Sequence, residues 1–238
     1  MKKWLKTFAI GATATLALAL VDLVATGWLY GGLLGTAGHA IIFLALAAGA
    51  LTTLLLPLSA ALSAASRFLA PKPRIALATA ALGMALVTLL VNAGLLGEHP
   101  LFTLGLTALT GCYGAGLMRL EQGAPLPYWA LLLFATIGIY LIDATQLRGL
   151  YVSQHLTLGI LCWLSTVVLF RKTFQPFERV RPILALGLAV PTLLAVAVFW
   201  SAPGDAIGED LRYALHHGST ATRNAMHVLS YATDWDGD

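Results

Sequence analysis

Seven apolar runs in the chain are each long enough to cross a lipid bilayer as an α-helix. A spanning helix needs ~20 apolar residues, because each residue advances the helix by ~1.5 Å through a hydrocarbon core ~30 Å thick. The runs that meet this requirement are 8–30, 40–62, 75–97, 100–120, 127–147, 151–170 and 182–201. The sequence therefore predicts an all-α fold, a polytopic transmembrane helix bundle with about seven spanning helices.

The composition agrees with lipid as the main solvent of the chain. Hydrophobic residues make up 58% and charged residues 11% of the 238 residues, whereas a soluble domain carries about 25% charged residues. The net charge of +3 does not indicate a nucleic-acid partner, because most basic residues flank apolar runs. Cys112 and Cys162 lie inside apolar runs and begin no metal-spaced motif.

The basic residues predict the orientation of the spans. Cytoplasmic loops of membrane proteins are enriched in Lys and Arg. With the N-terminus inside, the cytoplasmic segments hold eleven basic residues: Lys2, Lys3, Lys6, Arg67, Lys72, Arg74, Arg119, Arg171, Lys172, Arg179 and Arg181. The outer segments hold three, which are Arg148, Arg212 and Arg223. We therefore expect an N-in, C-out topology, with an uncleaved first helix.

A change of composition after residue 201 divides the chain into a predicted transmembrane domain, 1–201, and an extracytoplasmic tail, 202–238. Apolar residues recur in the tail at helical spacing, at Ile207, Leu211 and Leu215. Gly218 suits a helix end, and Ser219 or Thr220 suits the start of a second helix that carries Met226 and Leu229. We expect these apolar faces to lie on the membrane surface or against a partner domain.

Polar side chains inside the spans form one candidate cluster near the predicted outer leaflet. Its members are Asp22, Asn92, Tyr140, Asp143 and His155. Ionisable residues within lipid are costly and often mark ion or proton paths. Two interpretations are open: a small outward-facing cavity that binds a cation or proton, with His155 as a relay, or a set of structural hydrogen bonds between helices.

The last residues, Asp234-Trp235-Asp236-Gly237-Asp238, follow the start of a calcium-binding loop. Such loops place carboxylates at alternate positions, here Asp234, Asp236 and Asp238, and Ca²⁺ needs six to eight oxygen ligands. The pattern stops at its fifth position, so Ca²⁺ is the expected cofactor only if the loop is completed. The sequence contains no GxxxxGK[ST], HExxH or GxSxG motif, and we identify no catalytic residue.

The segment Arg223-Asn224-Ala225-Met226-His227, followed by the acidic end, resembles a junction in large bacterial membrane sulfatases. In that family a multi-helix membrane region is followed by a D-x-D-G-D-G calcium-type segment and a periplasmic hydrolase or transferase domain of the alkaline phosphatase superfamily. The match covers about the last fifteen residues and the general layout. The resemblance implies a bacterial inner-membrane location and a downstream periplasmic domain. No position here matches the family's nucleophile motif, so no catalytic residue is carried over.

Three interpretations of function remain open at this point. The chain is the membrane anchor and assembly domain of a longer extracytoplasmic sulfatase-like enzyme, a small ion or solute transporter that uses the outer polar cluster, or a non-catalytic structural subunit of a membrane complex. The first requires a following domain, the second a measurable flux, and the third a stable protein partner.

Overall fold

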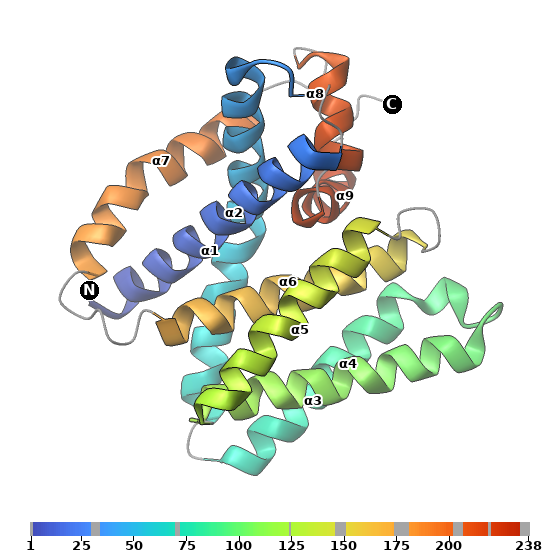
Figure 1. The fold of residues 1–238 in the computed structure, drawn as a ribbon. Coiled ribbons are helices and arrows are strands. Elements are labelled where there is room, and N and C mark those ends of the chain that lie inside the picture. Colours follow the sequence, from blue (N-terminus) through green and yellow to red (C-terminus); the bar gives the residue numbers. More distant parts are fainter. Residues whose placement is uncertain are drawn as a thin grey trace. The chain divides into compact units, whose positions relative to one another are not determined.

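The structure is a computed structural model, and it describes residues 2–29, 34–69, 72–123, 125–145, 151–173, 181–201, 207–218 and 220–233. These residues form helices and short turns, and no strand occurs among them (Figure 1). The long helices are α1 (Lys2–Leu29), α2 (Ala37–Leu69), α3 (Pro73–Val91), α4 (Pro100–Glu121), α5 (Leu126–Thr145), α6 (Val152–Thr173) and α7 (Arg181–Ser201). The shorter elements are η1 (Ala93–Leu95), α8 (Glu209–Tyr213), a π-helical turn η3 (Ala214–Gly218) and α9 (Ala221–Thr233).

The prediction of an all-helical membrane protein is confirmed. In the described part of the chain, α1 to α6 are each long and apolar enough to cross a bilayer. The apolar part described in α7 is shorter, Val190–Ser201. The protein is therefore an integral multi-pass membrane protein, and a seventh span and the N-in, C-out orientation stay predictions.

Large apolar side chains point outward from the long helices. Val24, Leu82, Leu101 and Phe134 expose between 70% and 86% of their surface. Soluble proteins rarely leave large apolar patches in water, because exposing apolar surface costs about 25 cal/mol per Å². Lipid tails remove that cost, so these outward faces are what a bilayer-embedded chain needs.

The described chain separates into two compact units. One comprises Met1–Ala60 with Thr173–Asp238, and the other comprises Ala61–Lys172. The first unit contains α1, α2 up to Ala60, α7 and the tail elements, and the second contains the end of α2 and α3 to α6. The predicted division at residue 201 separates residues expected inside the membrane from residues expected outside it. These two compact units do not test that division, and it stays a prediction.

In the first unit, small residues and hydroxyl groups join the long helices. The Cα of Gly49 on α2 lies so close to α7 that an added Cβ would overlap Ala195 and Phe199. Thr52 donates to the hydroxyl of Thr15 on α1 at 3.2 Å. Close approach through small residues and side-chain hydrogen bonds is the usual way in which helices associate in lipid, where the hydrophobic effect between helices is weak.

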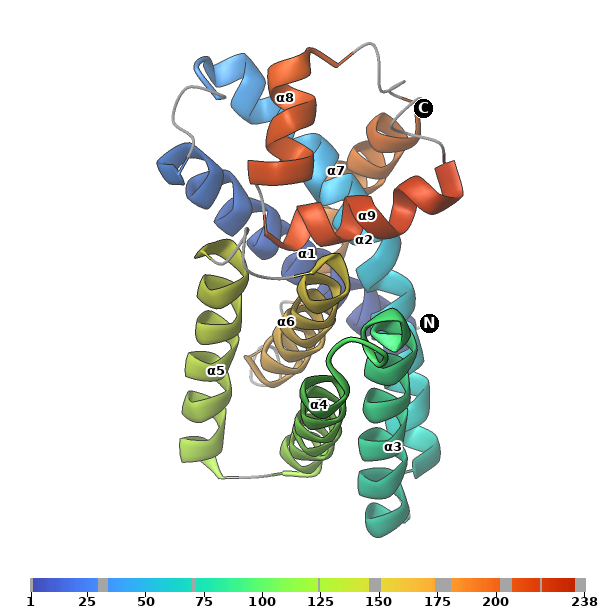
Figure 2. The same cartoon turned by 90° about the vertical axis from the view of Figure 1, so that its right-hand side faces the viewer.

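In the second unit, α3 and α4 lie side by side (Figure 1, Figure 2). The contact is made through Gly111 and Gly114 of α4. A Cβ on Gly114 would lie 2.5 Å from Cγ of Met84 and 2.8 Å from the carbonyl oxygen of Ala80. The backbones of the two helices can approach this closely only because glycine has no side chain.

Helix α6 makes several of the polar contacts of the second unit. Its Thr157 accepts from Nδ2 of Asn92, the C-terminal cap of α3, at 2.9 Å, and its Ser165 bonds the hydroxyl of Tyr113 on α4 at 2.5 Å. Near its C-terminal end, Arg171 pairs with Glu121 of α4 at 3.2 Å. Polar residues of α6 therefore join it to both α3 and α4.

Candidate functional site

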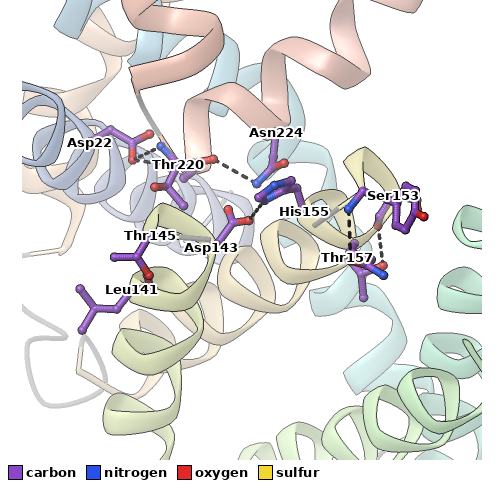
Figure 3. Close-up of polar contacts among 12 residues, drawn as sticks. Asp22, Leu141, Asp143, Thr145, Ser153, His155, Thr157, Thr220 and Asn224 are labelled. Atoms are coloured by element: carbon purple, nitrogen blue, oxygen red, sulfur yellow. Dashed lines mark hydrogen bonds and ion pairs between the residues drawn. The ribbon is translucent and has the colours of Figure 1, made fainter. Parts of the chain in front are cut away.

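The carboxylate of Asp22 on α1 is bound to the start of α9 (Figure 3). Its Oδ1 accepts from the backbone N–H groups of Thr220 and Ala221, both at 3.1 Å. Its Oδ2 accepts from the backbone N–H and from the hydroxyl of Thr222, both at 2.6 Å. Two carboxylate oxygens thus receive four hydrogen bonds, three of them from consecutive backbone groups.

This contact follows from what a helix start requires. The first N–H groups of a helix have no partner within the helix, and the aligned peptide dipoles make that end partly positive. A side chain at the start of the helix usually supplies the acceptor. In α9 the acceptor comes from Asp22, about 200 positions earlier in the chain. Asp22 is 0% exposed and lies within the apolar segment Gly11–Leu29. The four donors offset the cost of burying its carboxylate there.

The tail is therefore built into the chain and is not a loose extension. Both η3 and α9 contact α1. The side chains predicted to form the apolar faces of the tail, Leu211, Leu215, Met226 and Leu229, are all buried. The expectation had placed these faces on the membrane surface or against a partner domain, whereas the structure buries them within the chain, with Asp22 holding the start of α9.

A second buried acid, Asp143 of α5, contacts Nδ1 of His155 on α6 (Figure 3). Asp143 is 1% exposed and His155 is 6% exposed. A carboxylate only accepts hydrogen bonds, so Nδ1 carries the proton in this pair. Orienting a histidine through Nδ1 is a common arrangement both in proton transfer and in purely structural pairs. The geometry is compatible with either role.

Asn92 and Tyr140, the other two residues of the predicted polar cluster, are both buried. Asn92 is buried at the C-terminal end of α3, where Nδ2 also donates to the carbonyl of Thr88 at 2.9 Å. Tyr140 is buried on α5, three residues before Asp143 and on the same face. These two residues belong to the second unit with Asp143 and His155, while Asp22 belongs to the first with α9. The structure therefore brings together Asp143 with His155, and Asp22 with the tail.

Three histidines of the tail are near one another. The ring centroid of His216 lies 6.5 Å from that of His217 and 6.5 Å from that of His227. Burial lowers the pKa of His217 below its usual 6.5, and the positive charge of Arg223 lowers this pKa further. Among the described residues no group of three or more His, Cys, Asp or Glu is arranged to hold a metal ion. The predicted calcium ligands Asp234, Asp236 and Asp238 lie outside the described residues.

Sequence reasoning missed Thr222 and the partner of Asp22. Two features of the sequence point toward this contact. An aspartate inside a span needs hydrogen-bond donors, and a helix that starts near Thr220 has N–H groups with no partner inside the helix. Nothing in the sequence connected the two features.

No protein-family model, curated protein or solved structure matches the chain, so the comparisons show no family for it.

Proposed function

We propose that this chain is the membrane-anchoring region of a longer bacterial extracytoplasmic enzyme of the sulfatase kind, and that its tail fixes where the catalytic domain sits. The observation that carries the proposal is the capture of the start of α9 by Asp22 through four hydrogen bonds. The resemblance of residues 223–238 to the sulfatase junction supplies the class of enzyme.

The contact has a mechanical consequence for anything attached after α9. A flexible linker lets a following domain move freely, with a range set by the linker's length. Here α9 contacts α1, and seven successive residues at its start, Thr220 to Met226, are buried. A domain that follows would be attached through a helix whose start is fixed on α1, as an anchor and assembly domain requires.

The same contact weakens the transporter interpretation. A carboxylate that binds a transported cation must present oxygens to it, and Ca²⁺ or Na⁺ sites need several such oxygens. Both oxygens of Asp22 already accept two hydrogen bonds each. A cation would have to displace the start of α9, so we assign Asp22 to holding the tail.

Protease protection tests the role of the tail. Arg223 is 4% exposed in α9, so trypsin added to the extracytoplasmic side should cleave after it slowly in the wild-type protein. Asp22→Ala removes the acceptor for all four donors and should expose this bond to rapid cleavage. Asp210→Ala, which removes an exposed acid of the same tail, is the control and should cleave as the wild type does. Equal protection in Asp22→Ala would overturn the role of the contact.

The class of enzyme is tested separately on the complete gene product. Spheroplasts that express it should hydrolyse an aryl sulfate or phosphate ester added outside, and Asp22→Ala should lower the amount of correctly assembled enzyme. A product with no domain after residue 238, or the absence of any extracytoplasmic hydrolase or transferase activity, would remove the enzyme from the proposal. Ion flux through the reconstituted protein that is lost in Asp22→Asn would favour the transporter instead.

A further inference from the structure

A groove runs along α4 and α5 in the second unit, and its volume is about 760 Å³. The two helices are consecutive and are joined by residues 122–125 (Figure 2). Its walls are mostly apolar and include Leu109, Cys112, Gly116, Tyr128 and Leu131. Several of these side chains are open to the surroundings: Leu109 and Leu131 are 65% and 64% exposed.

One charged side chain, Arg119, is among the residues that line the groove. It is exposed and belongs to the last turn of α4, near the residues that join the two helices. Glu121, the acid closest to it along the chain, pairs with Arg171 at 3.2 Å. Arg119 therefore places a positive charge at one end of a groove whose other walls are mostly apolar.

The length of the groove corresponds to one leaflet of a bilayer. Ten residues separate Leu109 from Arg119 along α4, which corresponds to ~15 Å at the rise of an α-helix. This is half of a hydrocarbon core ~30 Å thick. Tyr128 lies at the start of α5, near the Arg119 end, and aromatic side chains of this kind are enriched at the level of lipid headgroups. Arg119 and Tyr128 thus mark the headgroup end, and Leu109 marks the end in the bilayer interior.

We propose that this groove binds one molecule of an anionic phospholipid, with an acyl chain along α4 and α5 and the phosphate group on Arg119. Basic pockets between transmembrane helices are typical binding sites for anionic headgroups. The hydroxyl of Tyr113 on the groove wall is already bonded to Ser165 at 2.5 Å. The inner part of the groove therefore offers apolar contacts to an acyl chain, and Arg119 provides the positive charge that binds the phosphate. The site is independent of the role proposed for the tail.

Native mass spectrometry of the full chain in detergent tests the headgroup preference. Phosphatidylglycerol should bind at lower concentration than phosphatidylcholine, and Arg119→Gln should weaken phosphatidylglycerol binding about fivefold, the effect of one basic residue near a membrane surface. The control is Arg74→Gln. Arg74 is exposed near the same end of the unit, since Gln122 beside α4 donates to the carbonyl of Pro73 at 3.3 Å, but it does not line the groove. Equal binding of both lipids, or equal losses in both variants, would overturn the anionic assignment.

A steric variant tests the location. A Cβ on Gly116 would meet nothing within 4 Å, so Gly116→Leu should fill the groove without disturbing the fold and abolish lipid retention. Gly105→Leu is the matched control, because Gly105 is also in open space on α4 and lies outside the groove. Undiminished retention in Gly116→Leu would show that lipid binds elsewhere, and displacement of the lipid by inorganic phosphate alone would point to a phosphate site instead.

The wild-type protein allows a measurement that depends on no variant. Cys112 is exposed on the groove wall and Cys162 is buried, so a maleimide should react with Cys112 first. In mild detergent, adding phosphatidylglycerol should slow this reaction severalfold, the same concentration of phosphatidylcholine should slow it less, and the slow reaction of Cys162 should be unchanged. An unchanged rate at Cys112 would count against lipid in the groove.

Discussion

A charged residue in an apolar helix must find compensating partners, and Asp22 finds them in the backbone of another helix. Its carboxylate replaces the side-chain cap that the first turn of α9 would otherwise need. The energetic value of the contact is shared by both partners: α9 gains an acceptor for its free N–H groups, and Asp22 avoids an unpaired charge within the membrane domain.

The hydroxyl of Thr222 offers a way to measure this contact without removing the acid. Thr222→Val keeps the shape of the side chain and loses one 2.6 Å hydrogen bond to Asp22, so we expect a loss of about 1 kcal/mol in stability. Asp22→Asn keeps acceptor capacity on one oxygen and loses the charge, at about 2 kcal/mol. In a double-mutant cycle, monitored by thermal unfolding in detergent, the two losses should be less than additive. Strict additivity would mean that the hydroxyl and the carboxylate act independently.

His217 predicts a pH dependence of the tail. Its pKa in the folded protein lies below the 6.5 of the unfolded chain, because burial and then the charge of Arg223 disfavour the protonated ring. Between these two pKa values the unfolded chain binds more protons, so stability falls as the pH falls through this window and is constant above it. NMR titration should give a pKa below 6.5 for His217, and His217→Gln should remove this part of the pH dependence. A pKa above 6.5 would contradict the prediction.

At the scale of elements, the contact between α3 and α4 depends on glycine. Gly114→Ala would bring a methyl group to 2.5 Å from Met84 and 2.8 Å from the carbonyl of Ala80. The two helices would have to move apart, at a cost of about 1–3 kcal/mol. Gly105→Ala on the same helix meets nothing within 4 Å and should be neutral or stabilising by up to about 1 kcal/mol, since alanine favours helix. Thermal unfolding of the two variants in one detergent measures the difference, and similar midpoints would exclude tight packing at Gly114.

The helices themselves were predictable from the sequence because lipid imposes a simple rule. Apolar length alone locates α1 to α6, and Gly and Pro mark their ends, as Pro73 and Pro100 begin α3 and α4. The tail was also predictable in part: Gly218 ends η3, and α9 begins just after Thr220. Each of these features is local, so neighbouring residues carry the information.

The partners of the polar residues were not predictable in the same way. The contact between Asp22 and Thr222 spans 200 positions, and no local pattern encodes it. Asp143 and His155 are 12 positions apart on consecutive helices, so their proximity near one end of α5 and α6 could be expected. The groove depends on how the side chains of α4 and α5 lie together in space, and this arrangement cannot be read from the lining residues, such as Gly116 and Arg119, along the sequence.

At the scale of the whole molecule, the distribution of charge predicts which way the chain crosses the membrane. Eleven basic residues fall on the predicted cytoplasmic side and three on the other side. Such a bias is expected to orient the spans during insertion, and with the predicted seven spans it would place α8 and α9 outside the cell. The proposed anchor needs this arrangement, because a tail on the cytoplasmic side could not hold an extracytoplasmic domain.

Single cysteines at exposed arginines test the orientation. Arg74 is the second residue of α3 and Arg212 lies in α8, and both are exposed, so each accepts a cysteine without loss of a buried contact. In a background with Cys112→Ser and Cys162→Ala, a membrane-impermeant maleimide should label Arg212→Cys in intact cells. Arg74→Cys should react only after the membrane is opened, because its side faces the cytoplasm in the predicted topology. Labelling of Arg74→Cys in intact cells, with Arg212→Cys protected, would reverse the orientation and remove the basis for an extracytoplasmic domain after α9.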